Sequence, residues 1–131
     1  RLGLAVEIRR GTAERLLVED ASVDAVVSTL VLCSVDDLDR ALGETLRVLK
    51  PGGRFVFLEH VAAPRGTWLR RLQRLVRPVW RVVADGCHPD RETDAAIAAA
   101  GFAEVRLERF RLPTGLVGPH IAGIAVKGPS P

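Results

Sequence analysis

The chain has 131 residues, of which 47% are hydrophobic and 27% are charged, and its formal net charge is +3. This length suits one compact domain, the composition excludes a disordered chain, and no apolar run approaches the roughly 20 residues of a membrane span. Six of the 19 basic residues lie between Arg65 and Ala84, where there is no acidic residue. The charge is therefore local, and no nucleic-acid partner is predicted.

The sequence contains two cysteines and no methionine. Cys33 and Cys87 have neither the number nor the spacing of a disulfide framework or a metal knuckle, so we expect both to be reduced. No secretory apolar segment opens the chain, which favours a cytoplasmic protein. Because no methionine begins the chain, we expect it to be a piece of a longer polypeptide.

Two strands are predicted in the first thirty residues. Leu4 to Ile8 is a short β-type run that Arg9-Arg10-Gly11 closes. Val23 to Thr29 is rich in β-branched residues with few polar breaks, which is typical of a buried strand in a parallel sheet.

A helix and a third strand follow. Asp36-Asp37 supply an N-cap and an acidic first turn, and Pro51 with Gly52-Gly53 ends the helix. Arg54 to Leu58 is the next strand, and a helix between two such strands forms a β-α-β unit, so these strands are expected to be parallel. The apolar residues with helical spacing are Leu38, Ala41, Leu42, Leu46 and Leu49.

The second half begins with helical segments and ends with two strands. Thr67 to Ala84 has apolar residues at steps of three and four, with Pro78 expected to kink or divide it. Arg91 to Ala100 is another helix candidate, and Phe102 to Leu112 and His120 to Lys127 are close enough to pair as antiparallel strands. The predicted order within one α/β domain, residues 1–131, is β, β, α, β, an α-rich insert at 65–84, α, β, β.

Several motifs resemble a known family. The stretch VLKPGGRFVFLEHV, Val48 to Val61, together with GTAERL at 11–16 and SVDAVVSTLVLCSV at 22–35, resembles the C-terminal part of a class I S-adenosylmethionine-dependent methyltransferase. The motifs STLVLCSV, EHVAA, DGC followed by RE, and PHIAGIAVK look most similar to the branch that contains membrane-associated thiol S-methyltransferases of animals and their bacterial relatives.

The resemblance implies a partial Rossmann-like methyltransferase sheet. It would contain strands 3, 4, 5, 6 and 7 of the family order 3-2-1-4-5-7-6, with the last strand antiparallel. Strands 1 and 2 and the glycine-rich cofactor loop have no counterpart here, so Leu4 to Ile8 lacks its usual neighbour and Val23 to Thr29 becomes an exposed edge. We therefore expect the chain to be poorly stable or to self-associate through unpaired strand edges.

The resemblance also implies S-adenosylmethionine as the cofactor. The segment at 12–14 corresponds to the loop that borders the adenine ring, and the segment at 28–30 lies at the carboxyl end of a strand, where ligands bind in open α/β sheets. Without the family, GTAERL is an ordinary turn and capped helix start, and the Ser-Thr pair satisfies a strand end. The candidate cofactor-binding residues are Thr12, Ala13, Glu14, Ser28, Thr29 and Leu30.

Glu59 and His60 are the candidate catalytic residues, because both stand where a strand ends on the acceptor side. An imidazole that titrates near neutrality could orient or deprotonate a methyl acceptor; alternatively, one of the two hydrogen-bonds the loop that follows them. The metal interpretation of His60, Asp85, Cys87, His88 and His120 is not supported by their spacing, so no metal is predicted, and Cys33 is expected to pack as a small apolar residue. The candidate acceptor-pocket residues are Trp68, Trp80, Asp85, Cys87 and His120.

The basic segment Arg65 to Ala84 has three interpretations. It can pack its apolar stripe on the core with a solvated basic face, cover the acceptor as a lid, or lie on a membrane surface as an interfacial helix. Only the last interpretation predicts a preference for anionic lipid and a peripheral membrane location.

The sequence therefore predicts transfer of a methyl group from S-adenosylmethionine to a small, apolar acceptor, either a thiol or a lipid-like nucleophile. Such a transfer requires the enzyme mainly to align the acceptor for in-line attack. The alternative is a non-catalytic α/β module that serves in interaction or membrane attachment. An oxidoreductase is disfavoured, because the chain has no dinucleotide glycine fingerprint.

Overall fold

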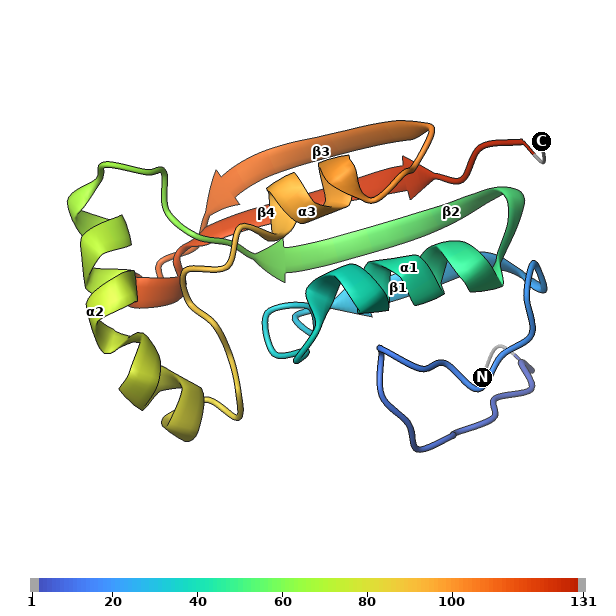
Figure 1. The fold of residues 1–131 in the computed structure, drawn as a ribbon, viewed down its shortest axis with the longest axis horizontal. Helices are drawn as coiled ribbons and strands as arrows, with labels where there is room; N and C mark the ends of the chain where they lie inside the picture. The colour runs from blue at the N-terminus through green and yellow to red at the C-terminus, as the bar shows by residue number, and fades with distance from the viewer. Residues whose placement is uncertain (1–2, 130–131) are drawn as a thin grey trace.

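A four-stranded mixed sheet is the centre of the fold in the computed structural model, which describes residues 3–129 (Figure 1). Its strands are β1 (Val23–Thr29), β2 (Leu49–His60), β3 (Glu104–Arg111) and β4 (Pro119–Val126), in the order β1-β2-β4-β3. β1 is parallel to β2, and β4 is antiparallel to both of its neighbours. This confirms the order 4-5-7-6 and the closing antiparallel pair.

Two helices, α1 and α3, lie against one face of the sheet, whereas α2 lies beyond the carboxyl end of β2 (Figure 1). The core between sheet and helices contains Phe55, Phe57 and Ile97, all buried. The Asp37 carboxylate accepts a hydrogen bond from the Arg40 backbone N–H at 3.0 Å, which confirms the predicted N-cap of α1. The helices are α1 (Leu38–Val48), α2 (Trp68–Val83), α3 (Thr93–Ala99) and the 3-10 turn η1 (Gly115–Val117).

The opposite face of the sheet is not covered by any described element. Val27 is 69% exposed and Ile124 is 40% exposed, although both belong to strands. β1 pairs only with β2, so its outer edge is free within residues 3–129. The expectation of an exposed apolar edge strand is confirmed.

The prediction of a strand at Leu4 to Ile8 is wrong, because this segment forms no ladder with any described residue. The side chains of Leu4, Val6 and Ile8 are 73%, 79% and 93% exposed. A β-type sequence becomes a strand only when a neighbour satisfies its backbone, and here no neighbour lies alongside it. The following GTAERL segment forms a turn with an isolated bridge between Thr12 and Arg15, and no helix starts there.

β2 is longer than predicted. It runs from Leu49 instead of Arg54, and its register with β1 shifts between Val23 and Ala25. Gly52 has φ +76°, and a Cβ on Gly53 would come within 2.8 Å of the Lys50 carbonyl oxygen. The two glycines therefore let the chain bulge inside a strand, where the sequence indicated a turn before one.

α2 is one helix that continues through Pro78, so no second helix begins there. Of its residues only Gln73 is buried, whereas Trp68 and Leu75 are 74% and 78% exposed. The interpretation that its apolar stripe packs on the core therefore holds only in part, because Leu69, Leu72, Val76 and Trp80 are half-buried. Within residues 3–129, no helix combines the length and the apolar character that crossing a bilayer would require.

Candidate functional site

The carboxyl ends of β1 and β2 lie side by side, and the buried Glu59 joins the two. Its carboxylate accepts hydrogen bonds from the Ser28 hydroxyl at 2.6 Å and from the backbone N–H groups of Val31 and Leu32 at 3.3 and 3.2 Å. Burial raises the pKa of Glu59, while these donors oppose that rise. Glu59 thus holds the loop that follows β1, whereas the predicted alternative placed such a bond in the loop that follows Glu59 and His60 themselves.

The predicted trio at the end of β1 divides into one buried and two accessible residues. The Ser28 hydroxyl is committed to the buried carboxylate of Glu59, whereas Thr29 and Leu30 are exposed at the edge of the sheet. Leu30 has φ +54°, and its N–H donates to the Leu58 carbonyl at 2.8 Å. A ligand at this edge would therefore meet Thr29 and Leu30, whereas the buried Ser28 contributes through its hydrogen bond to Glu59.

The loop at 12–14 is attached to the same end of the molecule. The Glu14 carboxylate accepts from the backbone N–H groups of Asp36 and Asp37 at 2.8 and 3.2 Å, and these bonds lower the pKa of Glu14. Ala13 packs against the core, and Thr12 is exposed. Both predicted cofactor segments, 12–14 and 28–30, are thus connected to the loop between β1 and α1.

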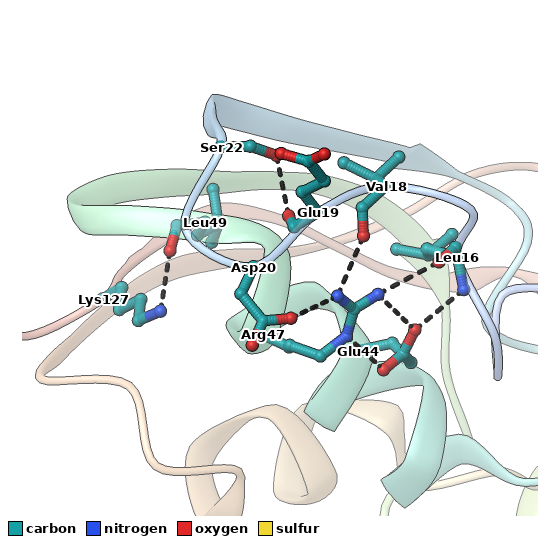
Figure 2. A network of polar contacts seen from close by, with 9 residues as sticks. All are labelled: Leu16, Val18, Glu19, Asp20, Ser22, Glu44, Arg47, Leu49 and Lys127. Carbon is teal, nitrogen blue, oxygen red and sulfur yellow. Dashed lines mark hydrogen bonds and ion pairs between the residues drawn. The ribbon is translucent and has the colours of Figure 1, made fainter.

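A charged network joins α1 to residues 16–20, which follow the loop at 12–14 (Figure 2). Sequence reasoning missed this network. The Arg47 guanidinium donates to both carboxylate oxygens of Glu44 at 2.7 and 2.9 Å, to Asp20 at 2.6 Å, and to the carbonyls of Val18 and Leu16 at 2.8 and 3.0 Å. Glu44 also accepts from the Leu16 N–H at 2.8 Å. The i, i+3 spacing of Glu44 and Arg47 was visible in the sequence, but their distant partners were not.

On the acceptor side, His60 lies opposite His120 in the β2–β4 register, with ring centroids 6.2 Å apart. His120 stacks on Phe110 at 5.6 Å, and Nε2 of His60 lies 2.8 Å from Sγ of Cys87. Burial, and then the nearby His120, lower the pKa of His60 to about 4. His60 is therefore neutral at pH 7 and does not titrate near neutrality as its predicted role as a base assumed.

The five predicted acceptor-pocket residues do not line one cavity in the described chain. His120 lines a hollow of about 530 Å³ beside Val61, Ala63, Phe110 and Arg109, whereas Cys87 is buried against His60. Trp68 is exposed at the start of α2, Asp85 is exposed in the loop after it, and Nε1 of Trp80 has no partner among residues 3–129. A larger open hollow of about 960 Å³ lies on the uncovered sheet face, where Ser28 and Thr29 form part of the wall.

Cys33 is buried, as predicted, but it lies beside His60 and Cys87 instead of among apolar side chains alone. Both cysteines are free thiols, in agreement with the reduced state expected from the sequence. Burial raises the pKa of the Cys33 thiol to about 11. The sequence treated Cys33 and the Cys87–His60 region separately, because 27 or more residues separate the members of this group.

Comparisons with known proteins agree with this fold. Residues 1–57 match the family model described as a methyltransferase domain. The chain is 48% identical over 112 residues to the human thiol S-methyltransferase TMT1A, covering 84% of this chain and 46% of that protein. It is 33% identical over 119 residues to the malonyl-[acyl-carrier protein] O-methyltransferase of Methylococcus capsulatus, covering 87% of this chain and 39% of that protein.

Solved structures of similar fold include S-adenosylmethionine-dependent methyltransferases from Methanosarcina mazei and Thermotoga maritima. The first has a TM-score of 0.70 at 21% identity and covers 99% of this chain and 71% of its own; the second has a TM-score of 0.67 at 25% identity and covers 93% and 64%. The chain spans about half the length of the curated relatives it matches. Over the residues compared, sequence and fold agree, and the chain belongs to the class I S-adenosylmethionine-dependent methyltransferases.

Proposed function

We propose that this chain forms the adenine side and the acceptor side of an enzyme that transfers a methyl group from S-adenosylmethionine to a small, apolar thiol. The observation that carries the proposal is the connection of three segments, 12–14, 28–31 and 59–60, at the carboxyl ends of β1 and β2. This is the edge at which open α/β sheets bind ligands. A lipid-like nucleophile is the second acceptor class that an apolar site would accept.

The exposed residues at this edge suit an adenosine group. Leu30 and Val31 are 49% and 46% exposed and offer an apolar surface for a purine ring, while Thr12 and Thr29 offer hydroxyl groups beside it. The position of Val31 is fixed by the hydrogen bond that its backbone N–H donates to the Glu59 carboxylate. When bound, the cofactor would supply a methyl group already activated on a sulfonium, so these residues need only hold and orient.

The thiol acceptor is supported by the names of the relatives and by the shape of the acceptor side. Proteins named thiol S-methyltransferase TMT1A and TMT1B are 47% to 51% identical over 82% to 84% of this chain. The hollow beside His120 has apolar walls at Val61, Ala63 and Phe110 and is also lined by four charged residues, Glu92, Asp94, Arg109 and Arg111. His60 does not line this hollow, because its ring is buried against Cys87, so an acceptor there would meet His120 and Phe110.

Calorimetric titration of the chain with S-adenosylhomocysteine tests the cofactor edge. Leu30→Asn removes apolar surface and keeps a residue type that tolerates the positive φ, so we expect an affinity about 5-fold weaker than that of the unmodified chain. Leu75→Asn, which makes the same change at a leucine on α2 that is 78% exposed against 49% for Leu30, is the control and should bind unchanged. Absence of binding, or equal losses in both variants, would contradict the proposed edge.

The acceptor class is tested by incubating the chain with S-adenosylmethionine and matched alkyl thiols, alcohols and amines, followed by mass spectrometry. Methylation of thiols above the other two series is the expected result. A protein that binds S-adenosylhomocysteine but methylates only alcohols or amines would contradict the thiol assignment.

We further propose that α2 contacts an anionic membrane surface, which would make the protein peripheral at a membrane. The exposed apolar residues Trp68, Leu75 and Val79 share this helix with four exposed arginines, at 71, 74, 77 and 81. Apolar insertion together with cationic side chains is the composition of an interfacial helix. Sedimentation with phosphatidylserine vesicles should exceed that with phosphatidylcholine vesicles, and Leu75→Glu should abolish the difference; equal sedimentation would contradict it.

The free edge of β1 supports a third proposal, self-association of the chain. An unpaired edge with exposed apolar side chains is a template for pairing with another copy. Sedimentation velocity should show mass increasing with concentration, and Val27→Lys should suppress the increase.

If vesicle binding persists while S-adenosylhomocysteine binding is absent, the chain is better described as a non-catalytic interaction module.

A further inference from the structure

Three buried side chains from separate parts of the sequence converge behind the acceptor side. Cys33 comes from the loop after β1, His60 ends β2, and Cys87 lies in the loop after α2. One ligand atom from each lies within 4.8 Å of the other two, and the residues are only 3%, 5% and 7% exposed. Two thiols and one imidazole thus share one buried point.

Hydrogen bonding alone does not satisfy this group. Nδ1 of His60 is buried and has no partner among residues 3–129, while Nε2 faces Cys87 at 2.8 Å. A neutral imidazole has one N–H and one lone pair. If the Cys87 thiol donates to Nε2, the ring N–H on Nδ1 lacks an acceptor; if Nε2–H donates to the sulfur, the lone pair on Nδ1 lacks a donor. Zinc at Nε2 would replace the Cys87 contact and leave Nδ1 as an N–H donor, so the convergence of the three ligand atoms, and not this nitrogen, supports a metal.

Two cysteine sulfurs and one histidine nitrogen are a ligand set that zinc binds, with a fourth position left for an external ligand. A Zn²⁺ ion with two thiolates and a neutral imidazole has no net charge, which suits a buried site. Tetrahedral zinc would place its ligand atoms roughly 3.5 to 3.8 Å apart. The 2.8 Å contact would open and the separations of up to 4.8 Å would close, each by about 1 Å or less.

Contacts that involve no metal already hold two of the ligand segments in place. The Arg91 guanidinium donates to the carbonyls of Leu32 and Val35 at 2.8 and 2.6 Å, on both sides of Cys33. The His88 backbone N–H donates to the Cys33 carbonyl at 2.8 Å, which joins the loop after β1 to the loop after α2. The ligands are therefore positioned by their backbones before any ion binds.

We propose that Cys33, His60 and Cys87 bind one zinc ion that joins the loop after β1, the end of β2 and the loop after α2. The fourth position of the ion is open to an external ligand. The site does not depend on methyl transfer, because none of the three side chains is needed for the contacts that shape the cofactor edge.

The test uses the reduced chain, freed of metal by a chelator and kept under anaerobic conditions. Cobalt(II), as a probe for zinc, should give a thiolate charge-transfer band and the visible absorption of a tetrahedral ion at a 1:1 ratio, and zinc should abolish both. Cys33→Ser, Cys87→Ser and His60→Gln should each weaken zinc binding by at least about 10-fold. Asp85→Asn, a control at an exposed position of the same loop whose positive φ asparagine tolerates, should bind normally.

A second measurement does not require any variant to fold. The chain has only two cysteines, so zinc should slow thiol labelling of both, and a chelator should restore the rate. Thiols labelled equally fast with and without zinc would overturn the proposal. So would a Cys33→Ser/Cys87→Ser double variant that takes up as much cobalt as the unmodified chain, or a reduced chain that forms a Cys33–Cys87 disulfide on exposure to air and takes up no metal beforehand.

Discussion

Replacement of Glu44 by glutamine tests how the segment at residues 16–20 is attached to α1 (Figure 2). The carboxylate accepts three hydrogen bonds, two from Arg47 and one from the Leu16 N–H. The hydrogen bonds from Arg47 are the largest of the effects that lower the pKa of Glu44 from 4.5 to about 2. A fall of that size corresponds to at most about 3 kcal/mol of folding free energy.

Solvent reduces this limit, because the Glu44 side chain is 18% exposed and that of Arg47 is 31% exposed. We therefore expect Glu44→Gln to lower the free energy of unfolding at pH 7 by about 1 to 2 kcal/mol. The folded-state pKa lies below the unfolded-state value, so the contribution is fully present above pH 4.5 and is lost as the pH falls toward 2.

Urea unfolding followed by far-ultraviolet circular dichroism, at pH 7 and at pH 3, measures both effects. The difference between the unmodified chain and Glu44→Gln should shrink to less than half at pH 3. Glu108→Gln is the control, since Glu108 is exposed on β3 and accepts no side-chain hydrogen bond among the described residues. The reasoning is refuted if both variants lose equal stability at pH 7, or if the loss for Glu44→Gln is the same at both pH values.

Four further substitutions test the packing around the sheet by urea unfolding. Gly123→Ala should lower the free energy of unfolding by about 3 kcal/mol or prevent folding, because the alanine Cβ would lie 2.8 Å from a backbone atom of β3. Gly43→Ala on α1, where nothing lies within 4 Å of the added Cβ, should raise that free energy by about 0.5 to 1 kcal/mol. The reverse order of the two effects would contradict the strand register. Ser28→Ala removes the 2.6 Å hydrogen bond to Glu59 and should cost about 1.5 to 3 kcal/mol, and a loss below about 0.5 kcal/mol would argue against a buried carboxylate. Gln73→Ala removes the bonds that join α2 to the loop after β2 and to η1, at 2.8 and 2.9 Å; it should cost about 2 kcal/mol and speed hydrogen exchange in α2, and unchanged exchange there would contradict that role.

The sequence predicted where the candidate site residues lie in the fold better than it predicted what each residue does. The strand end at Thr29, the helix start at Asp37 and the strand end at Glu59-His60 were all placed correctly, so the edge that they form could be predicted. The roles could not, because they depend on partners distant in the sequence: Glu59 bonds the loop after the neighbouring strand, and burial lowers the pKa of His60 to about 4.

Local chemistry determined which elements form, because caps, proline, glycine and hydrophobic periodicity act between residues that are adjacent in the chain. These signals were sufficient for β1, α1 and the antiparallel β3–β4 pair. Tertiary structure alone decided that Leu4 to Ile8 remains unpaired, that part of the apolar stripe of α2 is exposed, and that Cys33, His60 and Cys87 meet. Each of these depends on which distant segment lies alongside, and neither the periodicity nor the spacing of neighbouring residues contains that information.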